Sequence, residues 1–184
     1  MRLSRTYSMK LKRRVEGKTD YKKRLALIKS RKPRLVARVK NKEVIAQVIE
    51  YQQKGDNIKA NANSTELKKI GWDKHPGNSS SAYLTGYMCG KRAIENGIKE
   101  CNLDIGLHTP VNGSNVFAVL QGAIEAGLKI PHNEKCFPKN LDTDAIEKIK
   151  PKIKPTKKKP ATKKKTTKKA SPKKKASKKK GDKK

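Results

Sequence analysis

The amino-acid sequence predicts an α/β fold in which a three-stranded antiparallel meander and a further strand form one sheet with helices packed on it. β-Branched residues run through 34–63 with turn signals between them, as in strands joined by hairpins. Residues 79–96 and 114–126 have helical periodicity, and an alternating strand pattern lies between them at 101–107. A sheet that buries one face under helices is a stable arrangement for this order of elements.

Charge is concentrated at the two ends of the chain, which has 184 residues and a formal net charge of +32. Residues 1–40 hold 16 Lys and Arg against 2 acids, residues 41–150 hold 14 against 13, and residues 151–184 hold 18 against 1. Such self-repulsion indicates a polyanionic partner, which is usually nucleic acid or an anionic membrane. We expect nucleic acid and no membrane, because no apolar run approaches the ~20 residues of a spanning helix and no signal-peptide pattern is present.

The first 33 residues predict a basic arm and one short helix. Residues 1–18 have no sustained period and are interpreted as an extended N-terminal arm. Residues 19–29 predict a helix with Thr19 or Asp20 as its N-cap. Pro33 ends it, because the residue before a proline avoids the helical conformation. The expected apolar positions of the helix are spaced i, i+4 and i+7: Tyr21, Leu25 and Ile28.

The β-rich segment predicts a hairpin followed by a third strand. Asn-Lys at 41–42 and Lys-Gly-Asp-Asn at 54–57 supply the two turns. In the first strand, period-two alternation puts Leu35, Ala37 and Val39 on one face. The opposite face carries Val36 and three cations in a row, on the sheet or at its rim: Arg34, Arg38 and Lys40.

The second half predicts the helices that cover this sheet. A short helical turn at 64–72 leads through a loop at 73–80 into the helix at 79–96. Small residues form a stripe along that helix, which predicts close packing on the sheet: Ala82, Gly86, Cys89 or Gly90, and Ala93 or Ile94. After the fourth strand, a turn is expected to end with a helix cap, and Gly127 stops the last helix. The turn consists of Asn112, Gly113 and Ser114.

Four segments follow from this pattern: the basic arm at 1–18, an α/β domain at 19–132, an irregular segment at 133–150 and a Lys-rich tail at 151–184. The tail uses Lys, Thr, Ala, Ser and Pro almost exclusively, in loosely repeated blocks of three lysines. It cannot bury enough apolar surface to offset its ordering entropy, so we expect order to end at about Lys150.

The sequence predicts neither a catalytic site nor a cofactor. One grouping could pass for a catalytic cluster, His108 with Thr109 and Ser114, but the region offers no base and orienting group at a recognisable spacing. Neither GxxxxGK[ST] nor GxGxxG occurs in this loop. The stretch at 103–132 is therefore interpreted as scaffold.

The cysteines are odd in number and far apart, which predicts reduced thiols that fill the core rather than a disulfide framework. They are Cys89, Cys101 and Cys136. A zinc site built from them with His75, His108 and His132 is the alternative, but the close ligand pairs of structural zinc sites are missing, and no metal is expected.

RNA is the nucleic acid that the basic N-terminal region favours. Arginine binds phosphate bidentately and tyrosine stacks on unpaired bases, and both occur in the first 45 residues together with Ser30 and Asn41. The tail offers lysine almost alone and is expected to bind phosphates diffusely. Because the tail resembles those of linker histones, a DNA-binding or nucleoid-compacting protein is the alternative function.

Three long motifs resemble the archaeal/eukaryotic branch of the ribosomal protein L-eighteen family. They are "TDYKKRLALIKSRKPRLVARVKNKEVIAQVI", "GNSSSAYLTGYMCGKRAIENGI" and "LDIGLHTPVNGSNVFAVLQGAIEAGLKIPH", and the likeness runs from about Arg5 to His132. It implies a non-catalytic constituent of the large ribosomal subunit, archaeal in type and cytoplasmic. The resemblance further implies that the chain, as a monomer without a cofactor, binds 5S rRNA and attaches it to the 23S-type rRNA in the central protuberance, beside neighbouring ribosomal proteins.

The resemblance also implies which residues contact RNA, namely positions in the arm, the first helix, the segment after it and the "GNSSSAYLTG" motif. They are Arg5, Tyr7, Lys10, Arg13, Arg14, Thr19, Tyr21, Arg24, Lys29, Ser30, Lys32, Arg34, Arg38, Asn41, Lys42, Gln47, Asn78, Ser81 and Tyr83. The chain departs from the family at Lys40, where Ser is common, at the missing Pro of "GNSSSAY" and at Asn115, where a basic residue is usual. The Lys-rich tail stands where the family has an acidic extension, so contacts of that extension are not carried over.

Overall fold

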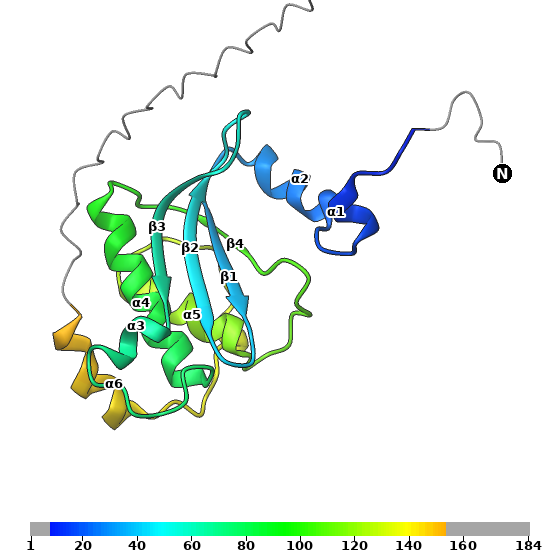
Figure 1. The fold of residues 1–184 in the computed structure, drawn as a ribbon. Coiled ribbons are helices and arrows are strands. Elements are labelled where there is room, and N and C mark those ends of the chain that lie inside the picture. The colour runs from blue at the N-terminus through cyan, green and yellow to red at the C-terminus, as the bar shows by residue number, and fades with distance from the viewer. Residues whose placement is uncertain (1–7, 154–184) are drawn as a thin grey trace, which may run out of the picture.

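The computed structural model describes residues 8–153, shown as a ribbon in Figure 1. Two predicted RNA contacts, Arg5 and Tyr7, lie outside the described residues, as does the Lys-rich tail from residue 154 onward. The α/β class predicted from the sequence is confirmed, with a four-stranded mixed sheet that carries packed helices.

The sheet has the strand order β3-β2-β1-β4. The first three strands are β1 (Arg34–Val39), β2 (Val44–Glu50) and β3 (Asn57–Asn63), and they form the predicted antiparallel meander. The fourth, β4 (Asn102–Asp104), pairs in parallel with β1 and is shorter than the strand expected at 101–107. It ends early because the Asp104 side chain accepts a hydrogen bond from the Gly106 amide at 2.9 Å, which turns the chain away from the sheet.

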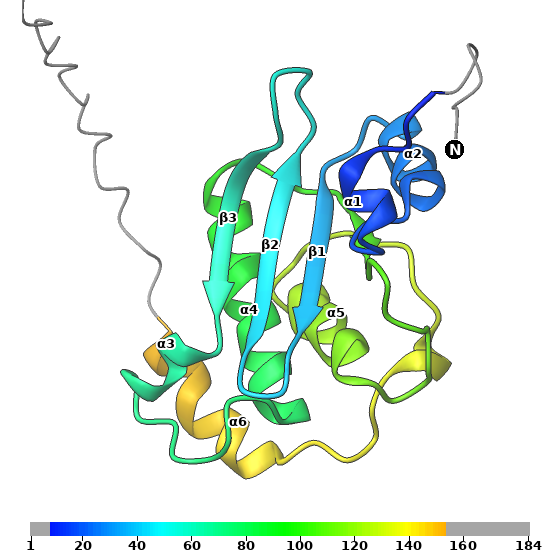
Figure 2. The same ribbon diagram turned by 45° about the vertical axis from the view of Figure 1, so that its right-hand side comes forward.

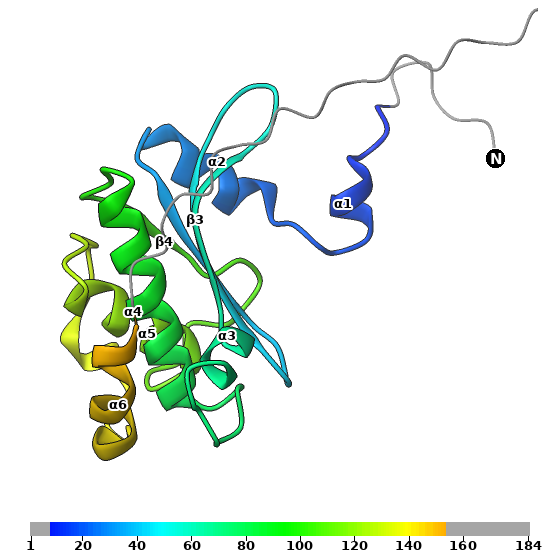
Figure 3. The same cartoon turned by 60° about the vertical axis from the view of Figure 1, so that its left-hand side comes forward.

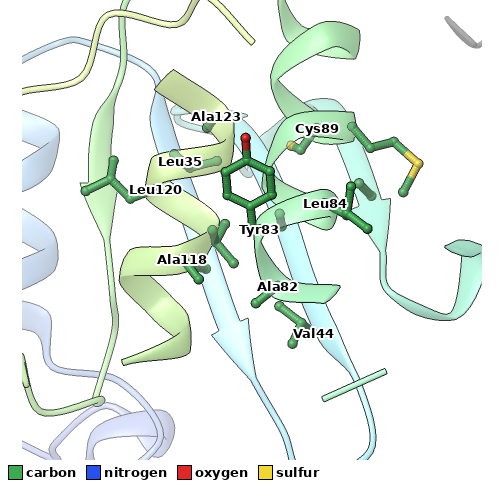
Figure 4. Packing of buried hydrophobic residues seen from close by; sticks show 14 of the residues in the cluster. Leu35, Val44, Ala82, Tyr83, Leu84, Cys89, Ala118, Leu120 and Ala123 are labelled. Atoms are coloured by element: carbon green, nitrogen blue, oxygen red, sulfur yellow. The ribbon is translucent and has the colours of Figure 1, made fainter. Parts of the chain in front are cut away.

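Two helices cover one face of this sheet. They are α4 (Ser79–Glu95), which packs on β2 and β3, and α5 (Asn115–Glu125), which packs on β1. A short helix, α3 (Thr65–Lys68), follows β3. Figure 2 shows both long helices behind the strands, and Figure 4 shows the apolar side chains that fill the layer between them. The core includes fully buried residues from every part of the layer, among them Leu35, Val44, Val48, Leu84 and Leu120.

The glycines of the small-residue stripe of α4 pack against α5, not against the sheet as predicted. A Cβ atom built on Gly86 would lie 2.0 Å from the carbonyl oxygen of Val119 in α5. In return, a Cβ atom on Gly122 of α5 would lie 2.0 Å from the carbonyl oxygen of Tyr83 in α4. The two helix backbones therefore touch directly at these glycines.

The segment predicted as irregular at 133–150 is largely structured. It contains the short 3₁₀ helix η1 (Glu134–Cys136), α6 (Thr143–Ile149) and a closing turn η2 (Lys150–Lys152). Ile146, Ile149 and Ile153 are buried, so packed structure is present beyond Lys150, where order was expected to end. The side chain of Lys150 lies over the Tyr83 ring, 5.1 Å from its centroid, and pairs with Glu125. Figure 3 shows α6 on the helix side of the sheet, away from α1.

The N-terminal region forms two helices on the β1–β4 side of the sheet, α1 (Lys12–Val15) and α2 (Tyr21–Lys29). The single turn of α1 corrects the expectation of a fully extended arm. Asp20 caps α2 as predicted, because its side chain accepts hydrogen bonds from the first-turn amides at 3.0 and 3.2 Å. The predicted apolar face is wrong at Leu25, which is 55% exposed, since α2 lies beside the sheet rather than over the core.

Candidate nucleic-acid interface

A cleft of about 750 Å³ separates α2 from the end of β1 and the segment after β4. Its lining is strongly cationic and includes Arg13, Lys18, Lys23, Arg24, Arg34, Arg38 and Lys40. Two carboxylates and several apolar side chains complete it: Asp20, Asp104, Ala26, Leu27, Val39, Leu103, Ile105 and Leu107. Cations around an apolar floor fit the phosphates and bases of unpaired nucleic acid.

Five alternating charges connect the walls of this cleft. Arg24 of α2 donates to Asp56 in the β2–β3 loop at 2.9 Å, and Arg34 of β1 donates to the same carboxylate oxygen at 3.0 Å. Arg34 also donates to Asp104 of β4 at 3.0 Å, and Asp104 accepts from Arg38 at 3.3 Å. The order is Arg24–Asp56–Arg34–Asp104–Arg38, so we call it the five-charge network. It joins three elements and one loop that are distant in sequence.

Arg34 is the buried centre of this network and is not placed to contact RNA as predicted. Its side chain is only 4% exposed, and both terminal nitrogens are engaged by carboxylates. A buried guanidinium needs such partners, because removing one of them leaves an uncompensated charge that costs about 3–5 kcal/mol. The period-two alternation of β1 predicted the sheet face of Arg34 correctly. That pattern could not reveal the two acids, Asp56 and Asp104, that neutralise the Arg34 side chain.

Arg38 lies at the outer end of the five-charge network, and its side chain is 39% exposed. Its Nη1 donates to the carbonyl oxygens of Ala37 and Asp104, both at 2.8 Å. The side chain lines the cleft, and these hydrogen bonds fix its guanidinium to the protein. Arg38 is therefore a held but accessible cation, and its contact with RNA stays a prediction.

The connection between α2 and β1 carries three predicted RNA contacts. Ser30 donates its hydroxyl to the carbonyl oxygen of Leu27 at 2.6 Å and accepts from the side-chain Nδ2 of Asn102 at 2.9 Å, so it ties the end of α2 to β4. Lys29 is exposed, and Lys32 is half-exposed in a 2.9 Å pair with Glu100. The hydrogen bond from Lys32 lowers the pKa of Glu100 below its usual value.

Further predicted contacts lie at the arm and at the start of α2. Lys10, Arg13 and Arg14 are exposed, and Arg13 donates from Nε to the Thr19 hydroxyl at 2.9 Å. Tyr21 is half-buried at the first turn of α2. These residues continue the cationic surface from the cleft toward the N-terminal arm.

The remaining predictions fall at the other end of the sheet or on its open face. Asn41 and Lys42 are exposed in the β1–β2 turn. Gln47 lies on the sheet face away from the helices and donates to the Asn61 side chain at 3.4 Å. The turn approaches the loop before α4, since a Cβ atom on Gly77 would lie 2.7 Å from the carbonyl oxygen of Asn41.

The "GNSSSAYLTG" motif builds the start of α4 and offers little to RNA. Asn78 accepts a capping hydrogen bond from the Ser81 amide at 2.9 Å. Ser81 is fully buried and donates its hydroxyl to the carbonyl oxygen of Pro76 at 2.7 Å, while the Tyr83 side chain is buried between α4 and α5 (Figure 4). Ser81 and Tyr83, which the sequence predicts as RNA contacts, are therefore buried scaffold residues in this structure.

Sequence reasoning missed several residues of the cleft. Lys18 and Lys23 line it, and their charge within the basic N-terminal region was a usable signal. His108 lines it too, although its segment was interpreted as scaffold. The Asp56 and Asp104 partners of Arg34 are 22 and 70 residues away along the chain, so no local pattern could reveal them.

The other sequence expectations concern helix capping, thiols and membranes. Ser114 begins α5 as predicted, but its hydroxyl is buried and makes no capping hydrogen bond. Cys89 and Cys101 are buried free thiols, and Cys136 is half-buried. Within residues 8–153 no group of three His, Cys, Asp or Glu residues could hold a metal ion. No helix in this part of the chain has the length and apolarity needed to cross a membrane.

Comparison with known proteins identifies the family. A sequence model described as "Ribosomal large subunit proteins 60S L5, and 50S L18" matches residues 5–98 and 95–133. The large ribosomal subunit protein uL18 of Aeropyrum pernix is 50% identical over 133 residues, which cover 72% of this chain and 62% of that protein. The uL18 proteins of Haloferax volcanii and Methanothermobacter thermautotrophicus are 53% and 48% identical, over 70% and 72% of this chain and 70% and 69% of their own lengths. The chain therefore belongs to the family of large-ribosomal-subunit proteins that comprises L5 of the 60S subunit and L18 of the 50S subunit.

Proposed function

We propose that this protein binds 5S rRNA through the cationic cleft and the N-terminal arm, and that it attaches this RNA to the 23S-type rRNA in the central protuberance of the large subunit. The observation that carries the proposal is the cleft itself. Seven Arg and Lys side chains line it, and the five-charge network fixes two of its walls. Family membership supports the proposal, because the matched relatives are named as large-subunit ribosomal proteins, and it confirms the prediction that the chain is not an enzyme.

The proposed RNA contacts are accessible residues of the cleft and the arm, with others from the β1–β2 turn and the open face of the sheet. Arginines and lysines bind phosphates, and amide and hydroxyl groups contact sugar or base edges. The set is Lys10, Arg13, Arg14, Lys18, Thr19, Tyr21, Lys23, Arg24, Lys29, Ser30, Lys32, Arg38, Asn41, Lys42 and Gln47, together with Arg5 and Tyr7 from the sequence alone. Arg34, Asn78, Ser81 and Tyr83 support these contacts from within the fold.

Location in the cytoplasmic ribosome follows from the family, and neighbouring ribosomal proteins are the remaining proposed partners. The Lys-rich tail has the charge to neutralise phosphates of a second RNA segment. Its 18 lysines over residues 151–184 give it no preference for base identity, which suits attachment more than recognition.

Co-purification tests this function. The full chain is expressed in an archaeal host, purified at moderate salt, and its bound nucleic acid is sized and sequenced. Recovery of an RNA of 5S length and sequence is expected. In competition, folded 5S rRNA should displace labelled 5S rRNA at far lower concentration than duplex DNA or an unrelated folded RNA. Equal competition by duplex DNA would instead support the DNA-binding alternative.

A further inference from the structure

All three oxygens of Asp104 accept hydrogen bonds, and two of these oxygens hold the side chain of Arg38. Its Oδ2 accepts from Arg34 at 3.0 Å, and its Oδ1 accepts from Arg38 Nη2 at 3.3 Å and from the Gly106 amide at 2.9 Å. Its main-chain oxygen accepts from Arg38 Nη1 at 2.8 Å. The carboxylate and carbonyl of one residue thus hold both terminal nitrogens of Arg38.

Gly106 supplies the space in which this guanidinium lies. A Cβ atom at position 106 would be 2.8 Å from Cζ, 2.9 Å from Nη2 and 3.0 Å from Nη1 of Arg38. Nearly equal distances to the three atoms place the glycine against the flat face of the guanidinium. The φ angle of Gly106 is +65°, a conformation that other residues rarely adopt, so both space and backbone favour glycine here.

These contacts leave one edge of Arg38 for a ligand. Asp104 uses Nη1 and one hydrogen of Nη2, and among residues 8–153 no hydrogen bond is formed by Nε. Nε–H and the second Nη2 hydrogen are parallel donors on one edge of the plane. Such an edge binds two oxygens of one phosphate bidentately, and fixing the side chain in advance removes the cost of ordering it on binding.

We propose that Asp104 and Gly106 are positioning residues that hold Arg38 ready to grip one backbone phosphate of folded 5S rRNA. The proposal rests on the proposed function and extends it to the Asp-Ile-Gly turn, which is not among the RNA contacts proposed above. The proposal predicts the opposite of the usual charge effect, because an acid at an RNA-binding surface ordinarily weakens binding by repelling phosphates. Here the acid strengthens binding, through geometry.

A double-mutant cycle tests the proposal. Binding of the full chain to 5S rRNA and to an unrelated folded RNA of equal length is measured for Arg38→Lys, Asp104→Asn and the double variant. Arg38→Lys keeps the charge and loses the fork, and we expect about tenfold weaker 5S binding. Asp104→Asn should weaken 5S binding to a similar extent although it removes a negative charge, while the unrelated RNA is bound within about twofold of wild type. In the Arg38→Lys background, Asp104→Asn should have almost no further effect.

Glu50→Gln is the charge-matched control, since Glu50 pairs with Lys59 at 2.9 Å on the same sheet and makes no contact with Arg38. Its 5S binding should be unchanged or slightly tighter. Tighter 5S binding by Asp104→Asn, or a loss that persists undiminished without Arg38, would overturn the proposal. If Asp104→Asn does not fold, the Arg38→Lys variant is the remaining test. Binding of 5S rRNA by that variant within twofold of wild type would then overturn the proposal. A wild-type chain without preference for 5S rRNA would refute the proposed function instead.

Discussion

Arg24 of α2 and Arg34 of β1 donate to the same oxygen, Oδ2 of Asp56, at 2.9 and 3.0 Å. The shared acceptor docks α2 on the sheet, and α2 itself contributes no buried residue. A helix with so little apolar contact depends on polar attachment for its position. The α2 wall of the cleft is therefore attached to the rest of the fold by polar contacts, namely the Arg24–Asp56 ion pair and the hydrogen bond between Ser30 and Asn102.

The two arginines around Asp56 should differ sharply in their contribution to stability. Arg34→Ala leaves two carboxylates without their buried partner and should lower the free energy of unfolding by about 3–5 kcal/mol. Arg24→Ala removes a pair at a side chain that is 36% exposed and should cost less than about 1 kcal/mol. Urea denaturation of both variants checks this. A loss below 1 kcal/mol for Arg34→Ala would contradict the structural role of the five-charge network.

The basic ends of the chain should differ in selectivity. Deleting residues 154–184 removes 17 lysines and should weaken binding to 5S rRNA and to an unrelated RNA by similar factors, with a flatter salt dependence. The cut follows Ile153 because that side chain is buried. Arg38→Ala should weaken 5S binding selectively, by about 1–3 kcal/mol for a specific contact. Both affinities are measured across a salt series, and loss of the 5S preference on tail deletion alone would reverse these roles.

Two helix caps provide a matched pair of stability predictions. Asn78→Ala removes a formed capping hydrogen bond at α4 and should cost about 1 kcal/mol. Ser114→Ala at α5 removes a buried hydroxyl that makes no cap bond, so its cost should be under about 0.5 kcal/mol or slightly favourable. Guanidinium denaturation of the two variants decides this. Equal losses would show that the Ser114 hydroxyl is paired in solution.

Thiol chemistry should separate the three cysteines. Burial raises the pKa of Cys89 and of Cys101 to about 12, so neither forms the reactive thiolate near neutral pH. A disulfide reagent at pH 8 should label one thiol, Cys136, in the native protein and all three in denaturant. Because unfolding exposes both thiols and returns their pKa to the ordinary 9.0, stability should fall as pH rises from about 9 toward 12. Rapid native labelling of Cys89 would contradict its burial.

The sequence predicted what is encoded by local periodicity. Alternation in β1 separated Leu35 from Arg34, and the helical patterns at 79–96 and 114–126 correspond to α4 and α5. Local periodicity could not predict contacts between distant segments, and both partners of Arg34 lie outside its own strand. The buried isoleucines of α6 and of the turn after it, Ile146, Ile149 and Ile153, are spaced i, i+3 and i+7, a helical signal that the Lys-rich composition around them obscured.

The direct backbone contact between α4 and α5 restricts how this protein can change by mutation. A side chain at Gly86 or Gly122 would collide with a carbonyl oxygen of the other helix. Every amino acid presents the same carbonyl, so no single substitution at the colliding residue could relieve the clash. A suppressor would have to displace a whole helix, and with it the core that α4 and α5 share. Damage at either glycine should therefore be reverted at the same codon and hardly ever rescued from a second site.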